Sequence, residues 1–126
     1  MKAQYLLDSN VLLWLNSNPD RIPAEVIAEL DAAETVYFSA ASAWELAIKQ
    51  SLGKLRMSGS IFTFVERAGL LELAVTTRFA EAAAQLPMHH RDPFDRVIVA
   101  QAMSEGLVLI TSDRRLARYD VKTLRV

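Results

Sequence analysis

Residues 4–15, QYLLDSNVLLWL, decide the fold, because a short apolar run ends at a carboxylate and a helical pattern follows at once. Gln4–Leu7 has the length and apolar character of a buried strand, and Asp8 ends it. Ser9 or Asn10 then begins a helix whose apolar residues recur at helical spacing. A strand that passes directly into a helix is the first half of a βαβ unit, which favours a parallel sheet.

The same alternation continues to the end of the chain, with no internal repeat, low-complexity tract or Gly/Ser linker. Further strands are expected at Val36–Ser39, Leu71–Val75, Leu107–Thr111 and Val121–Val126. Further helices are expected from Pro23, at Ser42–Leu52 before a stop at Gly53, at Ile61–Ala68, at Phe79–Leu86, from Pro93 to a stop at Gly106, and at Ser112–Ala117. We therefore expect one α/β domain over residues 1–126, a three-layer α/β/α sandwich with a mainly parallel sheet of about five strands.

The composition excludes several classes of protein. With 52% hydrophobic and 23% charged residues, the chain has the balance of a globular domain and no signature of disorder. The formal net charge of −1 means that nucleic-acid binding would need a local basic patch. The absence of cysteine excludes disulfides, a thiolate zinc site and a cysteine nucleophile.

The apolar N-terminal stretch does not have the pattern of a signal peptide. Asp8 and Asn10 interrupt it, and no small-residue cleavage site follows. No apolar run approaches the ~20 residues that span a bilayer. A cytoplasmic protein without a membrane partner is expected.

Four carboxylates fall where strands end or helices begin. Asp8 ends the first strand, and Asp113 follows the fourth. Glu45 is expected in the first turn of the helix after the second strand, and Asp95 in the first turn of the helix from Pro93. Helix N-termini gather at the C-terminal edge of a parallel sheet, which is where ligands bind in this fold class. We therefore expect all four side chains at one edge.

Helix capping explains each of these acids when it is taken alone. Ser42 and Glu45 form the capping-box pattern S-x-x-E, and Asp92, Pro93 and Asp95 form an N-cap, N1 and N3 series. Capping explains the whole set less well, because Asp92 already supplies the cap that Asp95 would duplicate.

Carboxylates that crowd at one edge raise one another's pKa unless a cation offsets their charge. Oxygen ligands suit Mg²⁺ or Mn²⁺, and such an ion activates water for phosphodiester hydrolysis. A metal-dependent hydrolase of phosphodiesters is the chemistry that the pattern favours.

Four blocks of the sequence resemble the PIN-domain ribonucleases, and among them the VapC-type toxins of type II toxin–antitoxin systems. The blocks occur in the family's order and cover nearly the whole chain: LLDSNVLLWL (6–15), SAASAWELAIKQSLGKL (39–55), HHRDPFDRVIVAQAM (89–103) and LITSDRRLARYDV (109–121). The resemblance implies a PIN-like fold and a Mg²⁺- or Mn²⁺-dependent endoribonuclease that cleaves single-stranded regions of RNA. It also implies a homodimer and a VapB-type antitoxin whose C-terminal segment covers the acidic site.

The resemblance also assigns roles to the acids. Asp8, Glu45 and Asp95 match the family's first three catalytic, metal-binding acids, and Asp113 matches the fourth, more variable one. Within DPFDR, the register with VIVAQA gives the metal role to Asp95 and the helix start to Asp92. No acidic position of the family is lost.

Basic residues near the same edge are candidates for binding the RNA backbone. These are Lys49, Lys54, Arg91, Arg114 and Arg115. They are explained equally well as solvated side chains or as intramolecular partners of the carboxylates. Arg96, which follows Asp95, is expected to be structural.

Histidines and aromatic residues are given no role in the chemistry. His89 and His90 are interpreted as solvent-facing or capping residues. Core packing is the preferred interpretation of most of the aromatic residues that could stack on bases, namely Trp14, Trp44, Phe38, Phe62, Phe64 and Phe94.

Two other classes of function stay open at this stage. A non-catalytic PIN-like module could use its acidic pocket to dock a basic segment of an RNA-bound or protein partner. A phosphatase or receiver-like domain could be built around Asp8, but the chain lacks a second acid beside Asp8 and a suitable lysine at a strand end. A toxin with endoribonuclease activity is the leading hypothesis.

Overall fold

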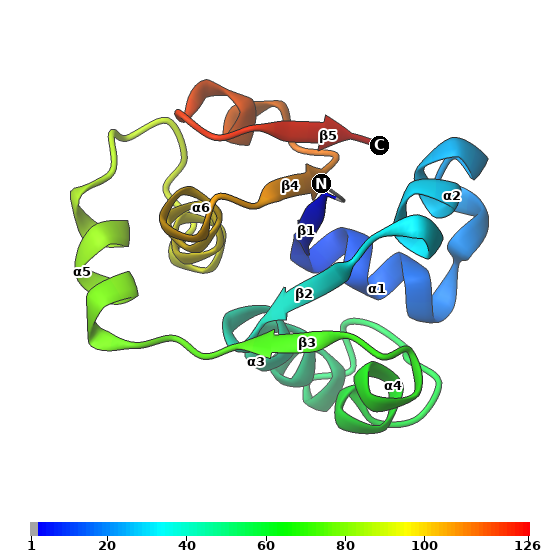
Figure 1. Ribbon diagram of the computed structural model, residues 1–126. Coiled ribbons are helices and arrows are strands. Elements are labelled where there is room, and N and C mark those ends of the chain that lie inside the picture. The colour runs from blue at the N-terminus through cyan, green and yellow to red at the C-terminus, as the bar shows by residue number, and fades with distance from the viewer. Residues whose placement is uncertain (1–2) are drawn as a thin grey trace.

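The computed structural model describes residues 3–126, which form a five-stranded, wholly parallel sheet in the order β3-β2-β1-β4-β5 (Figure 1). The strands are β1 (Gln4–Leu7), β2 (Thr35–Ser39), β3 (Leu71–Leu73), β4 (Val108–Thr111) and β5 (Thr123–Arg125). Every strand lies within or beside the range expected from the sequence, and the predicted α/β class with a parallel sheet is confirmed.

Within residues 3–126, six α-helices and two 3₁₀ helices connect the strands. They are α1 (Ser9–Ser17), η1 (Pro19–Arg21), α2 (Ala24–Ala32), α3 (Ala40–Ser51), α4 (Ile61–Arg67), α5 (Thr77–Gln85), α6 (Pro93–Glu105) and η2 (Arg114–Arg118). The helix expected at Ser112–Ala117 is η2, which is 3₁₀ and begins two residues later. Across residues 3–126, no helix has both the length and the apolar character needed to cross a membrane.

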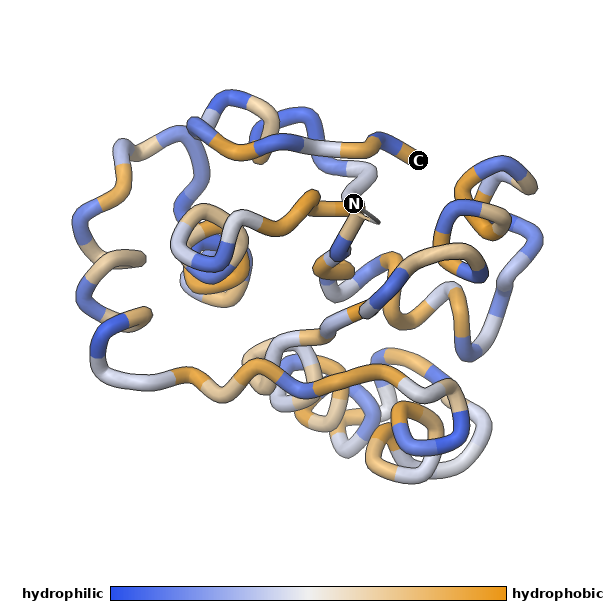
Figure 2. Tube along the Cα trace, in the orientation of Figure 1, coloured by the Kyte–Doolittle hydropathy of each residue, from blue (hydrophilic) through white to orange (hydrophobic). Residues whose placement is uncertain are grey.

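Alternating side chains of β1 supply the two faces of the sheet with core residues. Tyr5 and Leu7 pack into a cluster that also holds buried residues of α1, α2, α3 and α4. Leu6 packs into the opposite cluster, which includes Ile98 and Val99 of α6. The helices therefore cover both faces, with α1 and α2 on one side and α5 and α6 on the other (Figure 1). Figure 2 shows the hydrophobic stretch of β4 at the centre and hydrophilic residues around the outer turns.

The strand order reverses at β1. From β1 the chain proceeds through β2 and β3 on one side of the sheet, while β4 and β5 lie on the other. The register pairs Leu7 with Ile110, and the backbone N–H of Asp8 donates to the carbonyl of Ile110 at 3.0 Å. In open α/β sheets, the crevice at the carboxyl ends of the strands beside such a reversal is the usual place for a ligand.

The long helix α6 begins and ends as the sequence predicts. Asp92 is its N-cap, with Oδ1 accepting hydrogen bonds from the backbone N–H of Phe94 at 2.8 Å and of Asp95 at 3.4 Å. Pro93 occupies the first helical position, where its missing N–H is not needed. Gly106 ends the helix with a φ of 64°, a left-handed conformation that favours glycine.

The capping box predicted for Ser42 and Glu45 is wrong. The N-cap of α3 is Ser39, whose Oγ accepts a hydrogen bond from the backbone N–H of Ala41 at 3.1 Å. Strand β2 therefore passes into α3 without a loop, and Glu45 lies in the second turn rather than the first. Ser42 is buried inside the helix, where its Oγ accepts from the Oγ of Ser9 at 2.9 Å.

Arg96 fastens the segment that precedes α6, which agrees with the structural role expected for it. Its guanidinium is buried and donates to the carbonyls of Ala83 at 2.8 Å and Leu86 at 2.9 Å, at the end of α5. It also donates to the carbonyls of Pro87 at 3.1 Å and His90 at 3.2 Å. One side chain thus satisfies the last carbonyls of α5 and holds residues 86–90 against α6.

Replacement of this arginine should destabilise the protein. Arg96→Lys is expected to lower the free energy of unfolding by about 3 kcal/mol, because an ammonium cannot reach all of these carbonyls and leaves buried acceptors unpaired. Denaturant unfolding measures the loss. The exposed Arg91→Lys is the matched control and should change the free energy of unfolding by less than ~0.5 kcal/mol. Equal stability of the two variants would contradict this role.

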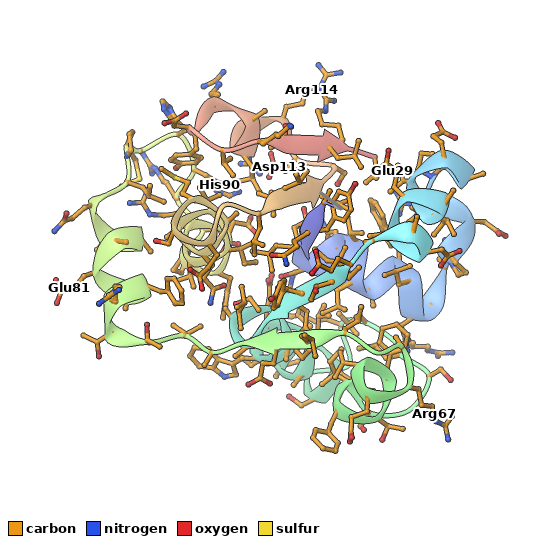
Figure 3. The ribbon with its side chains drawn as sticks, in the orientation of Figure 1. Glu29, Arg67, Glu81, His90, Asp113 and Arg114 are labelled. Carbon is orange, nitrogen blue, oxygen red and sulfur yellow. The ribbon has the colours of Figure 1, made fainter. Side chains whose placement is uncertain are left out.

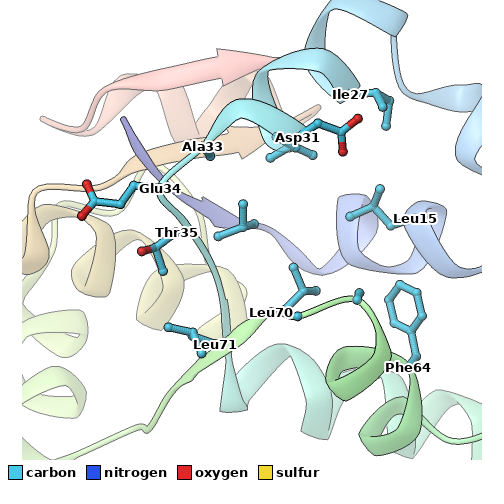
Figure 4. Close-up of a pocket in the computed structure, with 13 residues that line it drawn as sticks. Leu15, Ile27, Asp31, Ala33, Glu34, Thr35, Phe64, Leu70 and Leu71 are labelled. Atoms are coloured by element: carbon cyan, nitrogen blue, oxygen red, sulfur yellow. The ribbon is translucent and has the colours of Figure 1, made fainter. Parts of the chain in front are cut away.

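A mostly apolar groove of about 480 Å³ lies at the N-terminal ends of β2 and β3, away from the C-terminal ends of the strands, between α2 and α4 (Figure 4). Leu15, Ile27, Phe64 and Leu71 line it, with Asp31 among its polar residues. None of the four carboxylates singled out from the sequence lines this groove.

Candidate active site

The four carboxylates singled out from the sequence meet in one pocket of about 210 Å³ at the C-terminal ends of β1 and β4. Asp8 follows β1, Asp113 follows β4, and Glu45 and Asp95 come from α3 and α6. The pocket is also lined by Ser9, Asn10, Lys49, His90, Asp92 and Arg115.

Asp8 lies deepest in this group, with 3% of its surface exposed. Its Oδ1 accepts a hydrogen bond from the backbone N–H of Val11 at 2.9 Å, and its Oδ2 accepts one from the hydroxyl of Thr111. Burial raises the pKa of Asp8, and the hydrogen bonds from Thr111 and Val11 offset this only in part. Asp8 therefore caps α1 and, in the same position, presents a carboxylate that water solvates poorly.

Asp95 is the carboxylate of the pocket whose pKa is raised the most. Its pKa is raised to about 7, first by burial and then by the negative charges of Asp92, Asp8, Glu45 and Asp113. At neutral pH, Asp95 therefore holds a proton about half of the time unless a cation replaces that proton.

Asp113 has the opposite balance. Burial acts to raise its pKa, but the hydrogen bonds and charge of Arg115, together with His90, lower it below the ordinary value. Arg115 donates from Nε to Oδ1 at 3.1 Å and from Nη2 to Oδ2 at 3.0 Å. The Oδ1 atom also caps η2 by accepting from the backbone N–H of Arg115 at 2.9 Å. Asp113 is therefore ionised and held in place.

Glu45 has one paired oxygen and one unpaired oxygen. Its Oε2 accepts from Nζ of Lys49, one turn along α3, at 2.9 Å. Its Oε1 is buried and has no hydrogen-bond partner among the residues that the structure describes. A buried carboxylate oxygen without a partner is unfavourable, so this atom points to a ligand that the protein alone does not supply.

The donor set of the pocket fits a hard divalent cation. Four carboxylates converge with one imidazole and no thiol, and oxygen-rich ligation of this kind suits Mg²⁺ or Mn²⁺. Ligand atoms of His90, Asp95 and Asp113 lie within 4.8 Å of one another. A cation here would take the unpaired Oε1 of Glu45 and replace the proton that Asp95 otherwise retains.

The solvent-facing interpretation of His90 is wrong. Its side chain is 7% exposed, and Nε2 lies 2.9 Å from Oδ2 of Asp95 and 3.2 Å from Oδ2 of Asp113 (Figure 3). His90 does not cap α6 either, because Asp92 does so; Nδ1 of His90 accepts from the backbone N–H of that cap residue at 3.1 Å. His89 is half-buried and sets its ring edge-on against Tyr119, with the centroids 4.9 Å apart.

Comparison with known proteins assigns this chain to a family. The sequence profile of the PIN domain matches residues 5–122. The chain belongs to the PIN-domain family. The ribonuclease VapC22 of Mycobacterium tuberculosis is 29% identical to this PIN domain over 117 residues, which are 90% of each chain. The resemblance to VapC-type PIN-domain ribonucleases, which the four sequence blocks predicted, is confirmed.

Solved structures resemble this PIN domain over nearly its whole length. A chain of FitAcB from Neisseria gonorrhoeae matches with a TM-score of 0.63 and 28% identity, covering 95% of this chain and 96% of that one. A chain of DNA-bound VapBC from Salmonella typhimurium matches with a TM-score of 0.71 over 98% of both chains. At 20% identity, the second likeness shows the fold alone.

The basic residues of this PIN domain divide into two groups. Lys49 and Arg115 line the pocket, where each is paired with a carboxylate. Lys54, Arg91 and Arg114 are exposed and do not line it. Figure 3 shows Arg114 pointing outward from η2. The structure thus brings two of the five predicted substrate-binding residues to the acids and leaves three facing solvent.

Most of the six aromatic residues are buried or half-buried, as predicted, and two are exposed. Trp44 is 65% exposed and Phe62 is 69% exposed, whereas Phe38 is buried as expected. The ring of Trp44 lies edge-on to that of Phe94, with the centroids 5.3 Å apart, so the contact links α3 and α6 beside Glu45 and Asp95.

The raised pKa of Asp95 predicts how the stability of the metal-free PIN domain depends on pH. Between the ordinary value of about 4 and the folded-state value of about 7, the unfolded chain has lost this proton while the folded chain retains it. The free energy of unfolding should therefore fall as the pH rises through that window. Thermal unfolding in EDTA should show a smaller fall for Asp95→Asn than for the wild type. Equal falls would contradict the assignment.

Proposed function

We propose that this protein is a Mg²⁺- or Mn²⁺-dependent endoribonuclease toxin that cleaves single-stranded regions of RNA by water attack on a phosphodiester. The observation that supports this most strongly is the convergence of four carboxylates in one pocket. Two of them are incompletely stabilised: the Oε1 atom of Glu45 has no hydrogen-bond donor among the described residues, and the raised pKa of Asp95 shows that its negative charge is unfavourable. Membership of the PIN-domain family and the likeness to ribonuclease VapC22 point to RNA as the substrate.

The carboxylates of Asp8, Glu45, Asp95 and Asp113 would hold the divalent cation. Bound there, such a cation supplies Lewis-acid stabilisation of the charge that develops on the phosphate and makes water a better nucleophile near neutral pH. Asp8 is fixed by Val11 and Thr111, so its carboxylate cannot turn away from the pocket. Asp95, whose raised pKa lets it hold a proton near neutral pH, would present an ionised carboxylate to the bound cation and would help to orient the attacking water.

Basic side chains would hold the RNA around this centre. Lys49 and Arg115 keep two of the acids in place and leave their remaining N–H groups for phosphate oxygens. Lys54, Arg91 and Arg114 are exposed and would contact phosphates farther along the strand. These contacts carry no sequence information, so they suit a substrate recognised by its single-stranded backbone.

A cognate VapB-type antitoxin is proposed as the partner that neutralises the activity. The solved relatives include VapBC and FitAB complexes, in which the toxin chain occurs with its partner. A basic segment of the antitoxin would cover the acidic pocket and compete with the cation. We further propose that the protein acts in the cytoplasm as a homodimer.

Incubation of the purified protein with cellular RNA tests this function. Cleavage is expected with Mg²⁺ or Mn²⁺, and it should disappear with EDTA. Asp8→Asn should be inactive although it folds, because asparagine caps a helix nearly as well as aspartate. Cleavage that survives both chelation and the substitution would contradict the mechanism.

A binding module without catalytic activity is the second candidate. The specific observation in its favour is that two acids of the pocket already bind the cationic side chains of Lys49 and Arg115. Such a module would bind an arginine-rich peptide and show no metal-dependent turnover. Cleavage of RNA by the free protein with Mn²⁺ would exclude it.

A further inference from the structure

The hydrogen bonds around His90 fix which of its ring nitrogens carries the proton. Nδ1 accepts a hydrogen bond from the backbone N–H of Asp92 at 3.1 Å. An acceptor nitrogen must keep its lone pair, so the ring proton lies on Nε2. The backbone amide that begins α6 thus selects the tautomer.

The Nε2–H group faces two acids at once. It donates a hydrogen bond to Oδ2 of Asp113 at 3.2 Å, and Oδ2 of Asp95 lies 2.9 Å from Nε2 as an ion-pair contact. The two acids come from α6 and from the end of β4, 18 positions apart in the chain, and the imidazole contacts both. The ring therefore donates to one carboxylate and lies against the other.

The backbone of His90 keeps the ring where it is. Its N–H donates to the hydroxyl of Tyr119 at 3.0 Å, and its carbonyl accepts from Nη1 of Arg96 at 3.2 Å. Only 8% of the residue is exposed, so neighbouring side chains surround the ring. Two hydrogen bonds to the backbone and one to Nδ1 hold His90 in place, so its imidazole can define the position of the side chains that contact it.

We propose that His90 is a positioning residue that donates Nε2–H to Asp113, contacts Asp95, and so sets the two carboxylates at the spacing needed to bind a divalent cation. The proposal rests on the proposed function. His90 itself does not ligate the cation, because a ligating histidine offers one ring nitrogen to the metal and donates from the other. In His90, the second nitrogen accepts instead. The contact of Nε2 with Oδ2 of Asp95 leaves the Oδ1 atom of that carboxylate to face the cation.

Long-range ¹H–¹⁵N NMR of the imidazole tests the assignment directly. In the metal-free protein, we expect a protonated Nε2 and an unprotonated Nδ1, and we expect the same tautomer after Mg²⁺ is added. Protonation of Nδ1, or loss of the Nε2 proton when Mg²⁺ is added, would overturn the proposal. This readout does not depend on RNA cleavage.

Two substitutions separate positioning from mere support of the fold. In His90→Asn, the short amide can still accept from the backbone N–H two residues on, as in an Asx-turn, but cannot reach the acids. In His90→Gln, the amide N–H₂ group can take the place of Nε2–H as the donor to the carboxylates. His89→Gln is the matched control at the neighbouring position.

Titration of Mn²⁺ alone, followed by calorimetry, gives the quantitative test. His90→Asn should bind Mn²⁺ roughly 10–100-fold more weakly than the wild type, the usual effect of losing a residue that orients metal ligands. His90→Gln should recover most of the affinity, and His89→Gln should match the wild type. All variants should melt within a few degrees of one another without metal.

The outcomes distinguish the proposal from its rivals. An equal loss of Mn²⁺ affinity in the Asn and Gln variants would indicate a direct ligand and overturn it. Unchanged affinity in His90→Asn would also overturn it while leaving the proposed function intact. Failure of the wild type to bind Mn²⁺ would instead contradict the proposed function and remove the basis of the inference.

Discussion

Asp95→Asn is expected to reduce RNA cleavage roughly 100-fold or more while the protein stays folded, since even residues that only orient metal ligands contribute 10–100-fold. The side chain of Asp95 contacts His90 and does not cap α6, because Asp92 does so. Its pKa near 7 shows that its charge is unfavourable without a cation. The variant should therefore be as stable as the metal-free wild type, or more stable, at pH 8.

Asp92→Asn is the matched control, three positions earlier in the same helix. Asparagine accepts the N-cap hydrogen bonds nearly as well as aspartate, so the loss of stability should be ~1 kcal/mol or less. Cleavage should persist. Initial rates on a single-stranded RNA and thermal unfolding curves, measured for both variants, provide the comparison. If Asp92→Asn were inactive and Asp95→Asn were active, the roles assigned to the two acids would have to be exchanged.

Glu45→Gln is expected to have the second-largest effect, weakening both Mn²⁺ binding and cleavage by about 100-fold. The reason is the Oε1 atom, which is buried and has no hydrogen-bond partner among the described residues, so a cation would stabilise it. An amide has the same shape but supplies a weaker oxygen ligand and no charge, so the fold should survive. Calorimetry with Mn²⁺ and single-turnover cleavage measure the two losses.

Lys49→Gln is the control for this second prediction. It removes the partner of the other oxygen, Oε2, and frees a carboxylate that the lysine now neutralises in part. Mn²⁺ affinity should be equal or higher, whereas RNA should bind more weakly because one phosphate contact is lost. Unchanged Mn²⁺ affinity in Glu45→Gln would show that Glu45 is not a ligand.

The parts of the fold that the sequence predicted well are those governed by local physics. Gln4–Leu7 reads as a buried strand because it is short and apolar, and Asp92, Pro93 and Gly106 mark a helix because each suits one special backbone position. The convergence of Asp8 and Asp113 follows from topology alone, since parallel strands end at one edge.

The errors in the prediction arise where distant segments decide the outcome. Ser39 and Ser42 both suit an N-cap, and only the direct passage of β2 into α3 selects Ser39. His90 meets Asp113 across 23 positions, a pairing with no signature in local spacing. Core packing was predicted for most of the aromatic residues without saying which would be exceptions, and Trp44 of α3 is one of them, because its side chain is exposed in the folded chain.

The pocket also explains why the same residues serve folding and chemistry. Asp8 and Asp113 are N-caps of α1 and η2, so the helix starts hold their carboxylates at fixed positions. Asp95 and Glu45 have no capping role: Asp95 brings a charge that its surroundings disfavour, and Glu45 brings an unpaired oxygen. Two acids are thus fixed by the fold, and two present groups that a cation would satisfy.

Calorimetric titration of Mn²⁺ into the purified, metal-free protein tests the central claim most directly, because the claim is that the four acids form a cation site. The account predicts binding accompanied by proton release, since Asp95 must give up its proton, and predicts that binding is lost in Asp8→Asn. Absence of binding by the folded wild type, or equal binding by Asp8→Asn, would contradict it.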